Sequence, residues 1–352
     1  MRNHILSYSG GKDSTAMYLL ALERREKRPN FDFEVVFADT QNEHQHVYDF
    51  IAELPDKTGG PPIRTVTADF TDRFARRREY VKTHWPEDLQ ARALRVLHPS
   101  GSVFLDLAIL KGRFASSQAR FCTEELKVNV VAKQIYTPHW ENGDRVISWQ
   151  GIRREESRAR AELPMFSWNL WGDHKVLAFR PLIDWKLQDV WDMHARHGID
   201  RNPLYDYGFG RVGCFPCVLA NKQEVRLIDR RFSHVIDTLD EWEKTVSEAS
   251  KRGCATFFNV NTDPHVDKRI KEEKEKAKVL VGEWDLSQDD PQEEGLMEIY
   301  DPGDPDLSWI TQEEHGIRNI VKWSKTSRGG RQFEIDFYDD AMTPCNAWGA
   351  CE

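Results

Sequence analysis

The sequence predicts an α/β fold in which a parallel sheet carries helices on both faces, followed by a mostly helical region and a cysteine-bearing tail. Strand and helix signals alternate between His4 and His197, which is typical of such sheets. A short apolar run near the start also leads through a glycine-rich turn into an apolar-periodic helix. Among 352 residues, a hydrophobic fraction of 39% with 12 Trp and 18 Phe is enough for a sizeable core.

Five strands and five helices are expected in this first part of the chain. The strands are short apolar runs at His4–Ser7, Glu34–Ala38, Arg64–Thr67, Arg145–Trp149 and Val176–Phe179. The helices are expected at Thr15–Arg25, His46–Glu53, Thr71–Lys82, Glu124–Tyr136 and Leu187–His197. Because ligands of parallel sheets bind beyond the carboxyl ends of the strands, functional residues are expected at that edge.

The remaining segments differ in character. Phe166–His174 is rich in Trp and Gly, and we expect an irregular excursion there. From about Gln223 the pattern becomes helical and highly charged, which suggests a division into a nucleotide-binding domain at 1–222 and a second region at 223–352. Three features are expected in the second region: a solvated helix at Lys268–Lys278, an extended acidic linker at Ser287–Asp306 and a strand at Phe333–Tyr338.

The most informative motif follows the first strand. Six residues read Ser-Gly-Gly-Lys-Asp-Ser and open a helix, so their backbone N–H groups and the helix dipole surround one small volume. The glycines allow close approach, the lysine adds positive charge and the serines add hydroxyl donors. The pattern predicts a pyrophosphate cradle made of Ser9, Gly10, Gly11, Lys12, Asp13 and Ser14.

Two better-known phosphate motifs are excluded. A Walker A loop needs a glycine where Leu6 stands and a Ser or Thr where Asp13 stands. A dinucleotide-binding fingerprint needs a third glycine, which does not follow Gly11. The alternative interpretation is an ordinary strand-to-helix turn with incidental glycines.

Two further sites lie at the ends of predicted strands. Asp39 ends the second strand, where a carboxylate can accept a ribose hydroxyl or help hold Mg²⁺, or can simply cap the next helix. Gly151 to Ser157 follow the fourth strand: the glycine permits close approach, and Arg153 can hold a phosphate bidentately. Ordinary Arg–Glu pairing at a helix start is the alternative for this second motif.

The cysteines predict a metal centre. Cys214 and Cys217 form a C-x-x-C pair in a glycine–proline turn, Cys122 lies far upstream, and Cys345 and Cys351 lie in the tail. Four thiolates are the usual ligands of a [4Fe–4S] cluster or a structural zinc ion. One C-x-x-C pair with scattered partners favours the cluster over zinc, and a redox pair is the other alternative. The sixth cysteine, at position 254, stands alone and is expected to be structural.

Charge and hydropathy limit the function classes. No apolar run approaches the ~20 residues of a membrane-spanning helix, and no basic-then-apolar signal is present, so we expect a soluble, cytoplasmic protein without a membrane partner. The net charge of −9 argues against a broadly nucleic-acid-binding surface. Basic clusters at 73–78, 153–160 and 322–331 nevertheless leave nucleic-acid binding open.

Several motifs in order resemble one family. They are S-G-G-K-D-S, A-D-T-x-x-E, R-F-C-T-x-x-L-K, G-I-R-x-x-E-S, P-L-x-D-W-x-x-x-D-V-W, N-P-L-Y and G-C-F-P-C. Together they resemble the phosphoadenosine phosphosulfate (PAPS) reductase family of the PP-loop ATP pyrophosphatase superfamily, over roughly residues 4–220. The resemblance implies a Rossmann-like, adenine nucleotide alpha hydrolase-like fold with a five-stranded parallel sheet, a nucleotide over the loop and, where present, a cluster beside it.

Two departures from the reductase pattern matter. Cluster-bearing adenylyl-sulfate reductases have two adjacent cysteines, whereas Thr123 follows Cys122 here, so Cys345 or Cys351 would supply the fourth ligand. The tail motif E-C-G-L-H of the reductases is absent. The complete S-G-G-K-D-S loop is instead similar to enzymes that cleave ATP, including the cluster-binding protein of DNA phosphorothioation systems.

The resemblance therefore implies an enzyme that activates an acceptor oxygen with ATP and supports sulfur transfer through its cluster. Lys12 and Mg²⁺ would stabilise the departing pyrophosphate, Asp39 would steady the nucleotide and Arg153 would hold a phosphate. A cysteine desulfurase or thioredoxin-like donor of sulfur or electrons is an expected partner. The alternatives are a reductase that converts PAPS or adenylyl sulfate to sulfite, and a non-catalytic module that binds adenine nucleotides.

Overall fold

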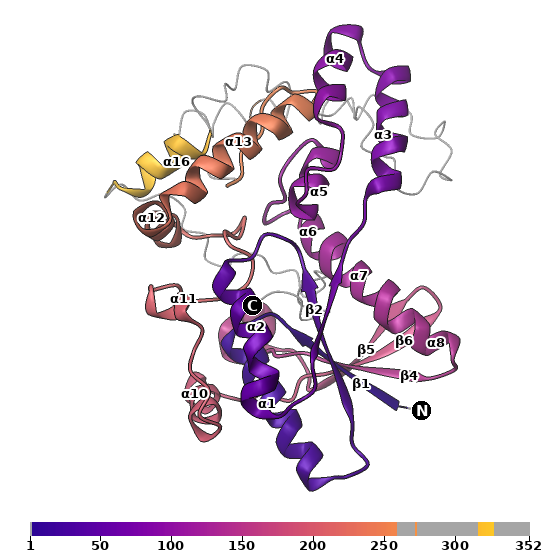
Figure 1. Ribbon diagram of the computed structural model, residues 1–352, viewed down its shortest axis with the longest axis vertical. Coiled ribbons are helices and arrows are strands. Elements are labelled where there is room, and N and C mark those ends of the chain that lie inside the picture. The colour runs from indigo at the N-terminus through magenta and orange to yellow at the C-terminus, as the bar shows by residue number, and fades with distance from the viewer. Residues whose placement is uncertain (1, 259–271, 273–315, 327–352) are drawn as a thin grey trace.

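A six-stranded sheet forms the centre of the protein. The computed structural model describes residues 2–258, 272 and 316–326, and Figure 1 shows its layers. The strands are β1 (Arg2–Tyr8), β2 (Phe33–Asp39), β3 (Ile63–Thr67), β4 (Arg145–Trp149), β5 (Phe166–Trp171) and β6 (His174–Phe179). Their order is β3-β2-β1-β4-β6-β5, with β5 antiparallel to β6 and all other neighbours parallel. The α/β class and the five expected strands are confirmed.

The expectation of an irregular excursion at Phe166–His174 is wrong. This segment is strand β5 and the turn into β6, so the sheet has an antiparallel edge strand beyond the five expected. The side chains of Phe166, Trp168 and Leu170 alternate along the strand and are 52%, 63% and 69% exposed. An apolar period-2 pattern that faces solvent does not resemble the half-buried strands on which the prediction relied.

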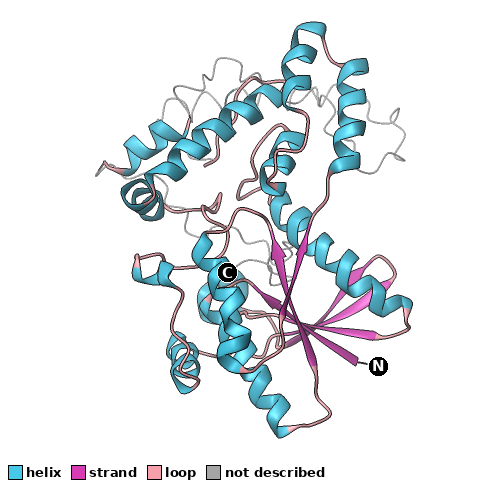
Figure 2. Ribbon diagram, viewed as in Figure 1, coloured by secondary structure: helices cyan, strands magenta, loops and turns pink. Residues whose placement is uncertain are grey.

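The helices lie on both sides of the sheet (Figure 2). The longer ones are α1 (Lys12–Lys27), α2 (Gln45–Thr58), α3 (Thr71–His84), α4 (Glu87–Val96), α5 (Val103–Lys111), α10 (Leu187–Arg196), α12 (Lys222–Arg231), α13 (Ser233–Ala249) and α16 (Ile317–Ser324). Short helical turns are η3 (Arg154–Glu156), α9 (Arg158–Ala161) and α11 (Pro203–Asp206). The strand order reverses between β1 and β4, so right-handed crossovers place α1 and α2 on one face of the sheet and the helical connection from β3 to β4 on the other. The crevice at such a reversal is where ligands bind.

One helical stretch between β3 and β4 has unusual bonding. It runs through α6 (Phe121–Thr123), η1 (Glu124–Val128), α7 (Asn129–Val131), η2 (Ala132–Tyr136) and α8 (Thr137–Glu141), and η1 and η2 are π-helical. The expected helix at Glu124–Tyr136 is thus confirmed, but with i→i+5 hydrogen bonds in two segments. In such bonding, residues five apart lie above one another. Figure 1 shows this stretch on the side of the sheet away from α1 and α2.

A helical layer follows the part of the chain that forms the sheet, as expected from the charged pattern after residue 223. Helix α13 packs against α4 and α5. Its Glu243 is fully buried and accepts hydrogen bonds from the backbone N–H groups of Phe257, at 2.7 Å, and Ile317, at 2.8 Å. This carboxylate therefore ties α13 to the start of α16. Because α13 packs on elements from the first half, the boundary at residue 222 stays a prediction.

Several expectations fall outside the described residues. They concern the linker at Ser287–Asp306, the strand at Phe333–Tyr338, the tail cysteines Cys345 and Cys351, and the helix at Lys268–Lys278 apart from Glu272. Within the described ranges, none of the helices combines the length and apolar character that crossing a bilayer requires.

Candidate functional site

The glycine-rich loop lies where β1 ends and α1 begins, packed between two neighbours. Gly10 has a φ of +79°, and a Cβ added there would lie 2.8 Å from Val47 Cγ1 in α2. On the other side, a Cβ added to Gly151 would lie 3.2 Å from the carbonyl carbon of Asp13 and 3.3 Å from the amide nitrogen of Ser14. The turn after β4 therefore lies against the loop backbone: an added Cβ would clash at Gly10 and would fit only tightly at Gly151.

The two serines of the loop close it on itself. The Oγ atoms of Ser9 and Ser14 lie 3.1 Å apart, and the Ser14 hydroxyl donates to the carbonyl of Gly11 at 3.0 Å. The Thr15 hydroxyl donates to the same carbonyl at 2.9 Å. The backbone N–H groups in the first turn of α1 have no acceptor inside the helix. This is the arrangement that a phosphate-binding turn needs.

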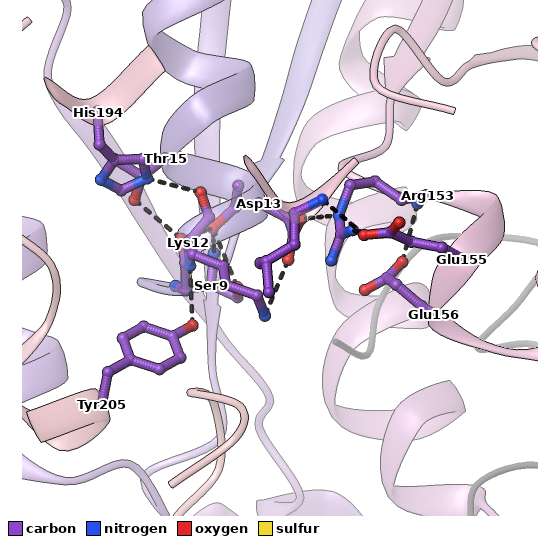
Figure 3. Close-up of polar contacts among 12 residues, drawn as sticks. Ser9, Lys12, Asp13, Thr15, Arg153, Glu155, Glu156, His194 and Tyr205 are labelled. Carbon is purple, nitrogen blue, oxygen red and sulfur yellow. Dashed lines mark hydrogen bonds and ion pairs between the residues drawn. The ribbon is translucent and has the colours of Figure 1, made fainter. Parts of the chain in front are cut away.

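A buried charge network lies behind the loop (Figure 3). The Asp13 carboxylate is fully buried; Lys12 Nζ lies 3.1 Å from its Oδ2, and the Nε of Arg153 donates to its Oδ1. Arg153 also pairs with Glu155 and is itself only 4% exposed. Burial opposes the charge of Arg153, but the three carboxylates of Asp13, Glu156 and Glu155 outweigh it and raise its pKa. The guanidinium expected to hold a phosphate is thus engaged with the loop itself.

Two residues missed by the sequence analysis hold the peptide groups of Lys12. The Lys12 N–H donates to the hydroxyl of Tyr205 at 3.0 Å, and the Lys12 carbonyl lies 2.9 Å from Nε2 of His194. Tyr205 belongs to the quoted N-P-L-Y motif, but only its place in the fold reveals the contact. No local signal in the sequence identifies His194.

A pocket of about 730 Å³ opens over the carboxyl ends of β1 and β2. Its residues come from the strand ends, the loop, the π-helical stretch and the turns at Gly151 and Gly213. Polar groups line one part, namely Ser7, Ser9, Ser14, Glu43 and Lys127, and mostly apolar groups line the other, namely Tyr8, Val36, Phe37, Ala38, Val128, Val131 and Tyr136. An apolar slot beside hydroxyl groups, a lysine and a phosphate-type turn suits an adenine nucleotide.

A second cavity of about 960 Å³ adjoins this pocket, because both are lined by Ser9, Lys127 and Gly213. The thiols of Cys122, Cys214 and Cys217 all line the second cavity. These three predicted ligands therefore line one cavity, and their binding of a metal stays a prediction. They come from the π-helical stretch and from the turn before α12.

The C-x-x-C turn is fastened to the end of β2. Glu43 and Cys214 form an antiparallel backbone bridge, and Asn42 Nδ2 donates to the carbonyl of Pro216 at 2.9 Å. The Cys214 thiol donates to Glu43 Oε1 at 3.5 Å. Burial raises the pKa of the Cys214 thiol well above its usual range, against the opposing charge of Lys127. Burial likewise raises the pKa of Glu43 to about 7.

Lys127 is the third functional residue that sequence reasoning missed. It lines both cavities, and its positive charge is the main influence that opposes the burial-driven rise in the pKa of Cys214 and of Glu43. It stands five residues after Cys122, and the π-helical bonding of η1 explains how both reach one cavity. Its position in R-F-C-T-x-x-L-K was the available signal, but α-helical spacing would not have paired it with Cys122.

The three cysteines at this cavity are the type of side chain that binds a metal group through thiolates. Among the described residues, however, no group of three or more His, Cys, Asp or Glu side chains is close enough together to hold a metal ion. Cys345 and Cys351, one of which was expected as the fourth ligand, lie outside that part of the chain. The [4Fe–4S] cluster, and the zinc and redox-pair alternatives to it, thus stay predictions.

Neither Asp39 nor Ser157 lines either cavity. Asp39 ends β2, and its Oδ1 accepts hydrogen bonds from the backbone of Gln41 and the hydroxyl of Tyr48, both at 2.8 Å. Helix α2 is capped by His44, so Asp39 does not cap it. A half-buried carboxylate at this edge fits one ligand of a phosphate-bound Mg²⁺. Ser157 is buried at the start of α9 and is absent from the lining of both cavities.

Comparisons with known proteins find one matching family and several relatives. The family described as "Phosphoadenosine phosphosulfate reductase domain" matches residues 3–220. An uncharacterised 37.8 kDa protein of Escherichia phage 186 is 36% identical over 366 residues, covering 99% of this chain and 96% of that protein. An adenosine 5'-phosphosulfate reductase of Salinibacter ruber is 36% identical over 67 residues, which are 19% of this chain and 26% of the reductase. A PAPS reductase structure from Candida auris covers 61% of this chain and 82% of its own, at 16% identity and a TM-score of 0.35.

Proposed function

Because the chain belongs to the phosphoadenosine phosphosulfate reductase family, we propose that it is a PP-loop enzyme that activates an acceptor oxygen with ATP and supports sulfur transfer. The observation that carries this proposal is the adjacency of the two cavities: a pocket lined by Ser9 and Ser14 of the intact S-G-G-K-D-S loop shares Ser9, Lys127 and Gly213 with a cavity lined by three cysteines. An activated group and a sulfur-bearing group would meet at that shared wall.

The activation step is an adenylation. An acceptor oxygen attacks the α-phosphorus of ATP, the bond from that phosphorus to the bridging oxygen breaks, and pyrophosphate leaves with its electron pair. The acceptor proton passes to solvent. The N–H groups at the start of α1 and the Lys12 ammonium, which lies 3.1 Å from Asp13, would stabilise charge on the pyrophosphate. The apolar slot of the pocket would hold the adenine.

A magnesium ion and an iron–sulfur cluster would assist the residues of this chain. Mg²⁺, held by Asp39 and the phosphates, would neutralise charge on the leaving pyrophosphate. An iron–sulfur cluster, held by Cys122, Cys214 and Cys217 with Cys345 or Cys351, would supply sulfur or redox chemistry. In this proposal Arg153 acts on the loop rather than on a phosphate, since it is bound to Asp13 and Glu155. A cytoplasmic location and a cysteine desulfurase or thioredoxin-like donor belong to the same proposal.

The products of ATP cleavage test the proposal. The full chain, incubated with ATP and Mg²⁺, is expected to form AMP and pyrophosphate in equal amounts, with water as the acceptor when no other is present. Gly10→Ala should abolish this, whereas Gly143→Ala, at a glycine with a φ of +76° and no atom within 4 Å of its added Cβ, should not. Formation of ADP and phosphate, or no ATP cleavage at all, would contradict the proposal.

A second candidate is reduction of a sulfonucleotide to sulfite. The matches to adenosine 5'-phosphosulfate reductases favour it, although the chain spans only about a quarter of those proteins' length. It predicts that PAPS or adenosine 5'-phosphosulfate binds more tightly than ATP and that sulfite forms with a thioredoxin-type reductant. Absence of sulfite under reducing, anaerobic conditions would exclude it.

A further inference from the structure

The Lys12 peptide is held from both ends by one distant segment of the chain (Figure 3). Its N–H donates to the Tyr205 hydroxyl at 3.0 Å, and its carbonyl accepts from His194 Nε2 at 2.9 Å. His194 belongs to α10 and Tyr205 to α11, on either side of a short connection. The ring of Trp191 lies edge-on to both, with centroids 5.2 Å from His194 and 5.6 Å from Tyr205. These contacts form a compact clamp.

The Lys12 N–H, which donates to the Tyr205 hydroxyl, is a hydrogen-bond donor that a bound phosphate would also need. Lys12 is the first residue of α1, so its N–H has no partner inside the helix. Such N–H groups bind anions at the start of a helix. In this structure a neutral hydroxyl oxygen lies where a phosphate oxygen would accept that hydrogen bond. The Lys12 Nζ also lies 5.5 Å from the centroid of the Tyr205 ring, so the ammonium is held at the same side chain.

His194 holds the other end by a different kind of contact. It is 3% exposed, and burial lowers its pKa, so the ring is neutral near pH 7. A neutral ring facing a carbonyl must carry its proton on Nε2. Because the His194 bond involves the carbonyl rather than the N–H, it can persist when the N–H changes partner. The orientation of the peptide would then be kept while a ligand enters.

We propose that Tyr205 is a specificity residue whose hydroxyl a nucleotide phosphate displaces from the Lys12 N–H, while His194 positions the peptide for that exchange. This rests on the proposed function, since it requires that the loop binds phosphate groups. Ligands that bear a phosphate at the loop must break the Tyr205 hydrogen bond, whereas ligands that fill only the apolar slot need not. The cost of breaking the Tyr205 hydrogen bond thereby lowers the affinity for ligands with a phosphate at the loop and leaves the affinity for ligands without one unchanged.

Titration calorimetry on the full chain with Tyr205→Phe tests the exchange. The variant keeps the ring but leaves the Lys12 N–H unpaired in the free protein. ATP and inorganic pyrophosphate should bind roughly three- to tenfold more tightly than to the wild type. Adenosine, which carries no phosphate, should bind equally to both. Tyr207→Phe is the matched control, because its hydroxyl lies 3.4 Å from His46 and not at the loop, and it should change none of the three affinities.

The outcomes separate this inference from the proposed function. Unchanged or weaker binding of pyrophosphate to Tyr205→Phe would overturn the inference alone, as would an equal gain for adenosine. A wild-type chain that binds neither ATP nor pyrophosphate would overturn both.

A second pair of variants tests His194. His194→Phe should weaken pyrophosphate binding about tenfold, and His194→Gln, which can still donate to the carbonyl, should recover most of that loss. Thermal unfolding of each variant establishes that it is folded, and His194→Gln carries the test if the phenylalanine variant is not. Equal binding by all three proteins, or no recovery with glutamine, would show that His194 does not position the peptide.

Discussion

Arg153 and Asp13 form a buried ion pair between the turn after β4 and the glycine-rich loop, although they stand 140 residues apart in the sequence. Asp13 has no solvent exposure, so its charge depends on Arg153 and on Lys12 beside it. The pair joins the two strands between which the sheet order reverses, β1 and β4. It therefore fixes the loop at the crevice where a ligand of this fold binds.

Breaking this pair should be costly. Arg153→Gln leaves a buried carboxylate with one cation, and we expect a loss of about 3–5 kcal/mol in the free energy of unfolding. The double variant Asp13→Asn with Arg153→Gln should recover part of it, because no isolated charge remains. Urea unfolding measures both. Arg158→Gln, at an exposed position in the same segment, is the control and should change stability by less than about 0.5 kcal/mol. A loss no larger than that of the control would show that the pair does not anchor the loop.

Alanine substitutions at Gly10 and Gly143 distinguish the effect of backbone strain from the effect of a steric clash. Both glycines have positive φ values, +79° and +76°, so alanine at either should cost about 1–2 kcal/mol of unfolding free energy. Only at Gly10 would the added Cβ meet a neighbour, Val47 Cγ1 at 2.8 Å. We therefore expect Gly10→Ala to lose pyrophosphate binding as well and Gly143→Ala to keep it. Titration calorimetry with pyrophosphate measures this. Equal affinities for pyrophosphate in the two variants would be inconsistent with the close packing of Gly10 against Val47.

The three thiols of the second cavity should share one metal group. After anaerobic purification we expect a brown protein with about four irons per chain, the content of a [4Fe–4S] cluster. Serine at Cys122, Cys214 or Cys217 should each lower the iron content strongly. Serine at Cys254, which does not line this cavity, should leave it unchanged. Iron and sulfide analysis, together with the absorption spectrum, checks this. A colourless protein that carries zinc would show that the site is the alternative zinc site and not a cluster.

Glu243 should make stability depend on pH. Burial raises its pKa in the folded state from 4.5 to about 7, so the folded protein binds this proton more tightly than the unfolded chain. Its contribution is therefore complete below pH 4.5 and is lost as the pH rises through 7, by at most about 3 kcal/mol. Urea unfolding at pH 5 and pH 8 should show this fall in the wild type and in Glu241→Gln, an exposed position on the same helix. An equal fall in Glu243→Gln would assign the pH dependence to other groups.

The fold was largely predictable because most of its strands are buried apolar runs. Strand β5 was missed since its large side chains face solvent. Helix α5 was missed for the opposite reason: residues 103–110 are all buried, so no polar face marks a helical period.

The site was predictable where one local motif carries it, as at the loop of residues 9–14. The cysteines predicted as metal ligands, Cys122, Cys214 and Cys217, line one cavity, but their role as ligands stays a prediction. The partners of the loop were not predicted, because His194 and Tyr205 reach Lys12 only through tertiary packing. Arg153 was correctly placed at a strand end, yet its side chain turns to Asp13, a contact that the sequence does not encode locally.

The π-helical segment at Glu124–Val128 has a consequence for how this protein can vary among relatives. Each added or removed residue turns the rest of a regular helix by about 100°. If the interval from Cys122 to Lys127 kept its five-residue spacing but adopted regular α-helical winding, the lysine would turn away from the wall common to both cavities, because five residues of an α-helix make about 1.4 turns. A relative that keeps this five-residue spacing should therefore keep the π-helical winding as well, even where the residues in the interval differ.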